Sequence, residues 1–532
     1  MQADLILSNG CIHTLDAKTP RATAVAIRDE HIVYVGDDAT AREALRPGGE
    51  AVDLKGRCVI PGLTDAHLHF QWYALGQQSV DAETPTLDEA LARVGERANA
   101  TVPGVWITGW GWNHNVWHLP TAGGLPTAAD LDRVAPNHPV ALEAKSGHAV
   151  WVNSRALELA GITASTPDPA NGQIVRDGHS PRGQPTGILL EDAMDLITKV
   201  KPEPTPEEMA EMMRAAFPLA HRAGLTGIHD FDGPAAFAAF QLLKRRGQLG
   251  LRVVKSIPRD RLSQAIDLGL RSGFGDDWLR IGSIKMFADG ALGPQTAAML
   301  GPFEGSNSLG IATLSEAEMA DNVRHANAAG LSCAIHAIGD RACRTVLDVY
   351  EEVGARELRN RIEHLQLLHP QDYARLGKLG VIASMQPTHA TSDRLISDQY
   401  WGKRSAGAYA WRTQLEAGAV LAFGSDCPVE KIDPLMGIHA AVTRRRADGS
   451  PGPEGWYPEQ RLTVEEAVRA FTWGAACAAG QEDRLGSIAP GKLADFTVLD
   501  RDIFAIEPME ILNTHVDATI IGGQFVWRAE QL

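Results

Sequence analysis

The chain has 532 residues, of which 44% are hydrophobic and 22% are charged, as in an ordinary globular protein. This length exceeds what one common hydrophobic core supports, so we expect several domains or one large barrel with additions. The net charge of −16 argues against nucleic acid or an anionic membrane as a partner, because binding phosphate groups requires a basic surface. A small-molecule ligand remains compatible with this charge.

The six cysteines are scattered without a C-x-x-C pair, which favours a reducing compartment over a disulfide framework. The first residues lack a basic segment followed by a long apolar stretch, so we expect no secretory leader. Apolar runs also fall short of the ~20 residues that a membrane-spanning helix needs. We therefore expect a cytoplasmic protein without a membrane partner. A homodimer is a general expectation for soluble proteins of this size.

Both ends of the chain predict short β-strands separated by turn residues. The predicted strands are residues 3–9, 23–27, 31–35, 51–54, 494–499, 518–521 and 525–527. Because such short strands need partners, the simplest arrangement is one small β-sandwich built from residues 1–57 and 483–532. Two unrelated β appendages are the alternative.

The middle of the chain alternates helical segments with β-branched runs, and a glycine often separates the two. This pattern occurs in residues 223–229, 329–336, 379–384 and 417–423, and further strands are predicted at 58–66, 251–257, 279–286 and 360–364. Such alternation indicates a parallel sheet, and eight units predict an α/β fold with a closed (β/α)₈ TIM barrel over residues 58–482. A doubly wound open sheet is the alternative, although no G-x-G-x-x-G follows an early strand.

The interval from His69 to His229 is too long for a single connection between two barrel strands. We therefore predict an inserted subdomain that covers about residues 72–220. Tryptophan is concentrated in its first half. Most of these indoles are expected to form the core of the subdomain. Trp110 and Trp112, which are flanked by glycines and by Asn113, are predicted to form an aromatic wall.

The strand predicted at 58–66 ends in a D-x-H-x-H pattern formed by Asp65, His67 and His69. Side chains alternate along a strand, so all three point to the same face. Two imidazoles about 6–7 Å apart on such a face can bind one divalent metal ion, and the carboxylate of Asp65 could orient one ring. The alternative is a pair of hydrogen-bonded histidines near a strand end.

Ionisable residues also follow the later predicted strands, and these residues are Lys285, Asp289, His336, His364 and Asp426. Each has an ordinary structural interpretation: a buried hydrogen bond for a histidine, a pair between Lys285 and Asp289, or a helix cap for Asp426. In a closed barrel, however, the carboxyl ends of the strands meet at one face, where barrel enzymes place their chemistry. Together with His67 and His69, the residues Lys285, His336, His364 and Asp426 predict a metal site.

The motif P-G-x-x-D-x-H-x-H at residues 61–69 and the ionisable residues after the later strands resemble the amidohydrolase superfamily. The runs 285–293, 336–342 and 385–389 resemble amidohydrolase family 3, the branch that contains N-substituted formamide deformylases. Residues 485–495 resemble the segment through which chains of this family pass from the barrel back into their β-sandwich. The resemblance spans nearly the whole chain, and its motifs specify the branch without specifying a substrate.

The resemblance implies a set of metal ligands, which are His67, His69, Lys285, His336, His364 and Asp426. The first two histidines would hold one ion and the last two a second. Lys285 would bridge the ions if its amine carries a carboxyl group derived from CO₂; without it, the site would hold a single ion or Lys285 would point elsewhere. Asp426 would also take the proton of the attacking water and deliver it to the leaving amine. Zinc suits these ligands best, with manganese, iron and cobalt as alternatives.

The sequence thus predicts a metal-dependent hydrolase that cleaves a non-peptide C–N bond in an amide, formamide, carbamate or cyclic amide. Candidates for substrate binding are Trp112, Asn113, His148, Asp289, Gln386 and His389. Both His148 and His389 also have a purely structural interpretation. An esterase, lactonase or phosphoesterase is the alternative activity, because the same site activates water without dictating the bond. A non-catalytic ligand-binding barrel is the third alternative.

Overall fold

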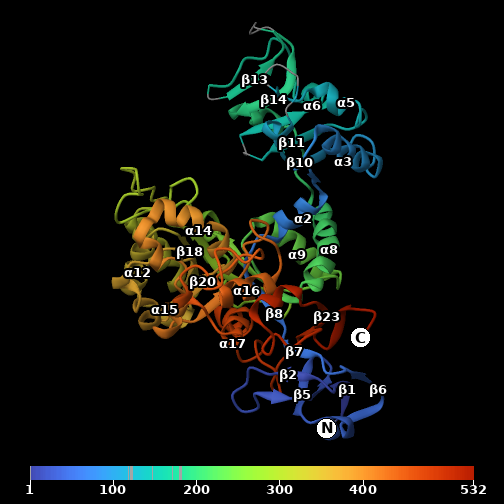
Figure 1. Cartoon of the computed structure of the whole chain (residues 1–532), viewed down its shortest axis with the longest axis vertical. Helices are drawn as coiled ribbons and strands as arrows, with labels where there is room; N and C mark the ends of the chain where they lie inside the picture. The colour runs from blue at the N-terminus through green and yellow to red at the C-terminus, as the bar shows by residue number, and fades with distance from the viewer. Residues whose placement is uncertain (1, 118, 120–123, 146–147, 171, 179–182) are drawn as a thin grey trace. The chain divides into compact units, whose positions relative to one another are not determined.

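The computed structural model describes residues 2–117, 119, 124–145, 148–170, 172–178 and 183–532 (Figure 1). It divides into two compact units, which we treat separately. The barrel unit comprises Met1–Tyr73 and Met209–Leu532, and the inserted unit comprises Ala74–Glu208. The inserted subdomain was predicted over a slightly wider range, about 72–220.

Within the barrel unit, a small β domain combines strands from both ends of the chain. One sheet has the order β5-β4-β1-β6, from β1 (Ala3–Ser8), β4 (Ala24–Arg28), β5 (His31–Gly36) and β6 (Leu45–Asp53). The other has the order β24-β23-β22-β7-β2-β3, from β2 (Cys11–His13), β3 (Arg21–Ala22), β7 (Cys58–Pro61), β22 (Phe496–Leu499), β23 (Val516–Ile521) and β24 (Gln524–Arg528). Leu7 and Val25 share one hydrophobic cluster with Val59, Phe496 and Ile520. The predicted β domain formed by both termini is therefore confirmed.

The barrel is an eight-stranded parallel sheet with the order β21-β20-β19-β18-β17-β16-β15-β8. Its strands are β8 (Leu63–Leu68), β15 (Leu225–Asp230), β16 (Arg252–Pro258), β17 (Leu279–Phe287), β18 (Cys333–Ala337), β19 (Arg361–His364), β20 (Ile382–Met385) and β21 (Leu421–Phe423). The first and last strands meet beyond the end of β21, where the backbone N–H of Asp426 donates to the carbonyl of His67 at 2.7 Å. This nearly closed sheet confirms the predicted TIM barrel.

The strand predicted at 58–66 is divided in the structure. Its first part, β7, belongs to the β domain, and only β8 belongs to the barrel. The division falls at Gly62, where a Cβ atom would lie 2.4 Å from Oγ1 of Thr226. Only a glycine allows so close an approach of the two segments. The apolar run is continuous in sequence because both of its parts are buried.

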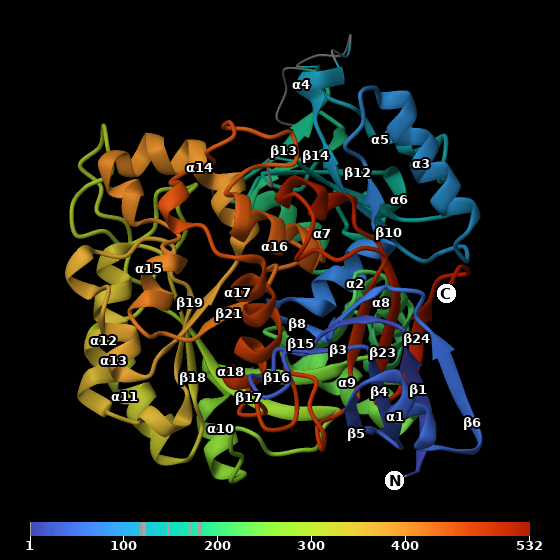
Figure 2. The same cartoon turned by 60° about the horizontal axis from the view of Figure 1, so that its bottom comes forward.

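Helices surround the barrel, and Figure 2 shows several of them outside β18. They are α9 (Pro234–Arg245), α10 (Leu262–Asp267), α11 (Glu316–Ala328), α12 (Asp340–Val353), α13 (Arg375–Leu379), α14 (Pro387–Trp401), α15 (Trp411–Glu416), α16 (Pro434–Thr443), α17 (Val464–Arg469) and α18 (Ala475–Ala478), with α1 (Asp38–Glu43) in the β domain. Helix α11 begins with a capping box between Ser315 and Glu318 and is followed by Gly330 at φ +77°. Glycine adopts this left-handed conformation readily, which lets the chain turn into β18.

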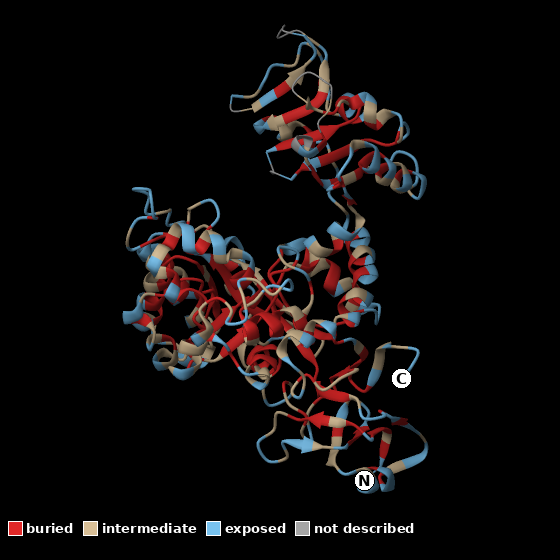
Figure 3. Cartoon of the chain, in the orientation of Figure 1, coloured by how far each residue is buried: buried red, intermediate tan, exposed pale blue. Residues whose placement is uncertain are grey.

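The strands of the barrel are buried almost throughout, whereas the outer faces of its helices are exposed (Figure 3). Two helices cross the boundary between the units in sequence: α2 (Phe70–Gln78) and α8 (Pro206–Arg222). Among the residues that the structure describes, every helix is too short or too polar to cross a lipid bilayer.

The inserted unit contains a mixed sheet with the order β13-β14-β12-β11-β10-β9. Its elements are β9 (Val80–Asp81), α3 (Leu87–Asn99), β10 (Ile107–Trp112), α4 (His114–Trp117), α5 (Ala128–Asp132), β11 (Val140–Ala144), β12 (Ala149–Val152), α6 (Ser154–Leu159), β13 (Gly172–Arg176), β14 (Pro185–Glu191) and α7 (Asp195–Thr198). Trp112, Trp117 and Trp151 lie together in its core. Trp117 and Trp151 have the core role that was predicted for most of the tryptophans. Trp112, which was predicted to form an aromatic wall with Trp110, is instead buried in this core.

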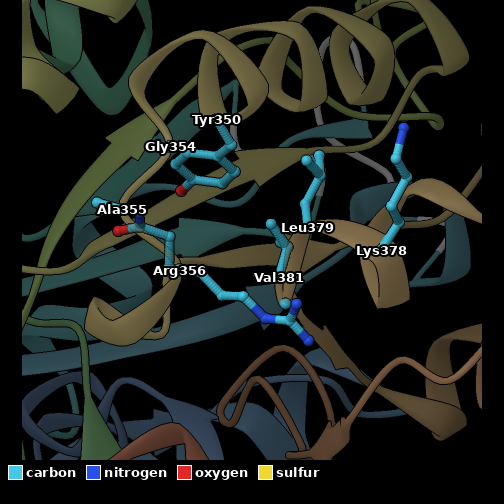
Figure 4. Close-up of a pocket in the computed structure, with 9 residues that line it drawn as sticks. Tyr350, Gly354, Ala355, Arg356, Lys378, Leu379 and Val381 are labelled. Atoms are coloured by element: carbon cyan, nitrogen blue, oxygen red, sulfur yellow. The ribbon is translucent and has the colours of Figure 1, made fainter.

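A pocket opens at the amino-terminal ends of β19 and β20 and is lined by Tyr350, Arg356, Lys378 and Val381 (Figure 4). None of the predicted site residues lines it. In (β/α)₈ barrels this end of the sheet serves stability, and the chemistry lies at the opposite end. The functional site is therefore expected at the carboxyl ends of the strands.

Candidate metal centre

Four histidines from three barrel strands come together at the carboxyl end of the barrel. His67 lies in β8 and His69 directly follows it, while His336 and His364 lie in β18 and β19. The ring centroids of His67 and His364 are 4.8 Å apart, and those of His336 and His364 are 4.6 Å apart. The structure thus brings together residues that are up to 297 positions apart in the sequence. We call these four histidines, together with Lys285, His389 and Asp426, the barrel cluster.

Asp426 lies among the imidazoles of the barrel cluster without forming a direct hydrogen bond to them. Its Oδ1 is 3.6 Å from Nε2 of His67 and 3.6 Å from Nε2 of His69, and its Oδ2 is 3.7 Å from Nε2 of His389. These separations exceed ordinary hydrogen-bond lengths. The ligand atoms of His67, His69 and Asp426 all lie within 4.8 Å of one another, as around a divalent cation, and those of His364, His389 and Asp426 form a second such group.

One nitrogen atom among the predicted metal ligands provides a test of whether a cation fits. Nε2 of His67 is buried, and it has no hydrogen-bond partner within the described part of the chain. A buried polar atom without a partner is costly, and coordination of a metal ion removes that cost. Imidazole nitrogens beside a carboxylate are ordinary zinc ligands. The residues present therefore fit a divalent metal ion.

A buried carboxylate orients the ring of His67. Nδ1 of His67 donates to Oε2 of Glu363 at 2.5 Å, which turns Nε2 toward Asp426. Glu363 is itself held by an ion pair with Arg361 and by the hydroxyl of Ser384, which donates to it at 2.6 Å. Such partners of a ligating histidine fix its tautomer and orientation.

His69 has a similar partner on the loop after β15. Its Nδ1 lies 3.2 Å from Oδ1 of Asp232, and the backbone N–H of Gln71 donates to the other oxygen of this carboxylate at 2.6 Å. Burial and the nearby carboxylate of Asp230 raise the pKa of Asp232. Lys255 pairs with Asp230 at 2.9 Å and completes this buried group of charges.

The remaining two histidines are held in neutral form. Nε2 of His336 donates to the carbonyl of Gly290 at 2.9 Å, and Nδ1 of His364 donates to Oε1 of Gln386 at 2.9 Å. Burial lowers the pKa of His336 to about 4 and the pKa of His364 well below its usual value. Neutral imidazole is the form that binds a metal ion. A ligand atom of His364 lies within 4.8 Å of ligand atoms of His389 and Asp426.

Lys285 lies in β17 beside these histidines, with its ammonium group against the rings of Phe231 and Phe287. The distances from Nζ to the two ring centroids are 4.7 and 4.9 Å. Burial lowers the pKa of Lys285 to about 8. Loss of the proton is therefore easier than for an exposed lysine.

Comparison with known proteins places this chain among proteins of the same architecture. The sequence model of the amidohydrolase family matches residues 50–527. The protein LONG AFTER FAR-RED 3 of Arabidopsis thaliana is 34% identical over 98% of this chain and 91% of its own length. This chain belongs to the amidohydrolase family.

Two further relatives agree with this assignment. The N-substituted formamide deformylase of Arthrobacter pascens is 31% identical to this amidohydrolase, over 97% of this chain and 98% of the relative. A crystal structure of an uncharacterized metal-dependent hydrolase from Pyrococcus furiosus superposes with a TM-score of 0.79 at 29% identity, covering 94% of this chain and 99% of that one. The resemblance to amidohydrolase family 3 that the sequence motifs indicated is confirmed.

One expectation about the D-x-H-x-H motif of this amidohydrolase was wrong. Asp65 orients neither imidazole, because its carboxylate accepts the hydroxyl of Ser425 at 2.5 Å and the backbone N–H groups of Ser425 and His67 at 3.0 and 3.1 Å. Asp65 therefore joins β8 to the loop after β21. The rings are oriented instead by Glu363 and Asp232.

The predicted substrate-binding residues lie in three settings. Gln386 and His389 are in the barrel cluster or in contact with it. Asp289 accepts the backbone N–H groups of Ala298, Ile338 and Gly339 at 2.8 to 3.0 Å and so shapes the loop after β17. The other three residues lie in the inserted unit and are Trp112, Asn113 and His148.

Within the inserted unit, Trp112 is buried, and its indole N–H donates to the carbonyl of Leu142 at 2.8 Å. His148 is exposed and lies 3.0 Å from Oε2 of Glu191. Asn113 is half-buried at the end of β10. Contact between these side chains and a substrate stays a prediction.

The residues that orient the histidines were missed by the sequence analysis. Glu363, Arg361 and Asp232 lie within or just after buried strands, where an unpaired charge would be costly. Their position in apolar strands was the available signal. That signal shows that each has a partner, but it does not identify the partner.

Proposed function

We propose that this amidohydrolase is a metal-dependent hydrolase that cleaves a non-peptide C–N bond in an amide, formamide, carbamate or cyclic amide. The observation that carries the proposal is the convergence of Nε2 of His67 and Nε2 of His69 on Oδ1 of Asp426, each at 3.6 Å. The named activity of the deformylase from Arthrobacter pascens supports the choice of a C–N bond.

In this proposal the metal ligands are His67, His69, Lys285, His336, His364 and Asp426. The ligand atoms of His67, His69 and Asp426 all lie within 4.8 Å of one another, which supports a first ion. His336, His364 and Lys285 would hold a second. When bound, a divalent ion supplies a Lewis acid for the carbonyl and lowers the pKa of water. Zinc is the ion that this set of nitrogen and oxygen ligands suits best.

A bridge between two ions requires a change at Lys285. The neutral amine attacks CO₂, a C–N bond forms, and the nitrogen releases a proton, which leaves a carbamate with two oxygen donors. The lowered pKa of Lys285 and its position against two aromatic rings favour the neutral amine. Without this modification, an ammonium group would lie beside cations and be repelled.

Asp426 moves the proton in the proposed reaction. Its carboxylate accepts a proton from the attacking water and passes it to the nitrogen of the leaving amine, so that the amine departs as a neutral group. Burial raises the pKa of Asp426, which favours temporary protonation. His389 and Gln386 are placed to contact the substrate, because each has a buried polar atom without a hydrogen-bond partner in the described chain.

Three finer properties complete the proposal. The cysteines that the structure describes are free thiols, which supports a cytoplasmic location. A homodimer is proposed on general grounds alone. The ligand is a small molecule, as the family assignment supports.

Activity on matched substrates tests the proposed function. Protein purified without chelators is assayed on an amide, a carbamate and an ester that share the same substituents, and ¹⁸O-labelled water shows whether the new oxygen comes from solvent. We expect hydrolysis of an amide or carbamate, with loss of activity after metal removal and recovery after zinc addition. Turnover of the ester alone, or activity that survives complete metal removal, would overturn the proposal.

A further inference from the structure

A second group of metal-ligating side chains lies in the β domain. Cys11 and His13 lie on β2, and their side chains share one face because they are two positions apart. Asp502, in the loop after β22, lies against the same face. We call these three residues the β-domain cluster. It joins segments 491 positions apart in the sequence, and it shares no residue with the barrel cluster.

The distances within the β-domain cluster match those around a tetrahedral ion. Sγ of Cys11 is 3.6 Å from Nε2 of His13 and 3.4 Å from Oδ2 of Asp502, and Nε2 of His13 is 2.9 Å from Oδ1 of Asp502. Zinc bonds of about 2.0 to 2.3 Å in tetrahedral geometry place ligand atoms roughly 3.3 to 3.8 Å apart. The nitrogen-to-oxygen distance needs to lengthen by a few tenths of an ångström. The carboxylate of Asp502 also has to turn, because its contacts with Cys11 and His13 use different oxygen atoms.

We propose that Cys11, His13 and Asp502 form a second metal site, which binds Zn²⁺ independently of the barrel cluster. A thiolate with an imidazole and a carboxylate selects zinc-like ions over Mg²⁺ and Ca²⁺, which prefer all-oxygen ligands. His13 is buried, whereas the side chain of Asp502 retains 28% of its exposure. The site is therefore accessible to an ion, and water can fill a fourth coordination position.

Neighbouring groups hold the ligands in place before an ion binds. The ring of His13 stacks on Phe504 with centroids 3.7 Å apart, and the backbone N–H of Phe504 donates to Oδ1 of Asp502 at 3.0 Å. Cys58, the neighbour of Cys11 on β7, directs its thiol to the same carboxylate oxygen at 3.8 Å. Prior placement of this kind lowers the entropic cost of binding.

An ion pair between His13 and Asp502 without a bound metal is the simpler explanation of their contact. Cys11 distinguishes this ion pair from the proposed metal site. Without a metal ion, the Cys11 thiol only donates a hydrogen bond to Oδ2 of Asp502 at 3.4 Å. In the proposed site the Cys11 thiol loses its proton and binds as thiolate, while His13 binds through Nε2 with its proton on Nδ1.

Cobalt(II) provides a direct test, because cobalt bound to a thiolate has a charge-transfer band in the near ultraviolet. The proposed ligands of the barrel cluster include no cysteine, so the band reports only on the β-domain cluster. The full-length protein is freed of metal, kept reduced with a phosphine and titrated with Co²⁺. We expect the band in the wild-type protein and in His67→Ala, with saturation at a stoichiometric amount of bound cobalt.

Three variants complete the test. Cys11→Ser should abolish the band, Cys58→Ser should retain it, and Asp502→Asn, which preserves side-chain shape, should weaken cobalt binding at least about tenfold, as loss of a ligand implies. Absence of the band in the wild-type protein, or its persistence in Cys11→Ser, would overturn the proposal. If Cys11→Ser fails to fold, unchanged cobalt affinity in folded Asp502→Asn would overturn it equally.

Discussion

The barrel cluster and the β-domain cluster use similar donor atoms in different surroundings. In the barrel cluster, His67, His69 and His364 each have one ring nitrogen held by a buried side chain and the other directed toward Asp426 or His389. In the β-domain cluster, a single imidazole is stacked on Phe504 and already contacts its carboxylate at 2.9 Å.

We expect this difference to distinguish a site for chemistry from a site that joins segments of the chain. Buried partners such as Glu363 keep the ligands of the barrel cluster in place while leaving nitrogen atoms unsatisfied. The β-domain cluster instead connects β2 with a loop close to the other end of the chain. We therefore expect the barrel cluster to control turnover and the β-domain cluster to control stability.

The largest expected effect is on turnover, and it compares two aspartates. Asp426→Asn should lower kcat by about 10² to 10⁴-fold, the range for loss of a group that transfers protons. Asp502→Asn, the matched control, should leave kcat unchanged. Steady-state kinetics with the best amide from the panel measure both. An active Asp426→Asn enzyme would contradict the proton-transfer role.

The next effect concerns the residue that positions His67. Glu363→Gln keeps the shape of the side chain but removes the charge that holds the imidazole, so metal affinity should fall about 10- to 100-fold. Competition with a chromophoric chelator, well below the unfolding temperature, measures this affinity. Because Arg361 also loses its charged partner, Tm should fall as well. Unchanged metal affinity with a lowered Tm would show that Glu363 serves stability alone.

A third prediction concerns Lys285. Lys285→Ala should reduce the amount of bound metal, because the proposed carbamate bridge is lost. Elemental analysis of both proteins, purified in parallel, measures the change. Unchanged occupancy would argue against a bridge at this position.

The smallest expected effect is on stability. Cys11→Ser should abolish the increase in Tm that Zn²⁺ produces through the β-domain cluster, because an ion that binds only the folded state stabilises it. Thermal unfolding with and without Zn²⁺ is compared in a background that carries both His67→Ala and His364→Ala, which removes one ligand of each ion proposed for the barrel cluster. A zinc-dependent increase that persists in Cys11→Ser would contradict the expected role.

The fold could be predicted largely from local patterns. Glycines such as Gly330 end helices before buried strands, and this signal lies within a few residues of sequence. The division between β7 and β8 at Gly62 could not be predicted, because it depends on a close approach to Thr226, more than a hundred residues later. Both sides of that glycine are equally apolar, so composition shows no boundary.

The part of the candidate site that lies at the ends of the barrel strands could be predicted from the sequence. His67, His336 and His364 lie at or near the ends of their strands, and the closed barrel brings them together. His389 lies instead in the first turn of α14, and Glu363 reaches His67 across 296 positions of sequence. Such pairings depend on barrel closure and side-chain direction, which a local pattern does not contain.

The most direct test of the central claim is the metal content of the barrel cluster. Elemental analysis is performed on Cys11→Ser, in which only the barrel cluster is expected to bind zinc, and on the same protein carrying His67→Ala. The account predicts at least stoichiometric divalent metal in the first protein and a large loss in the second, with both proteins folded. Equal metal content in the two proteins, or only trace metal in the first, would contradict it.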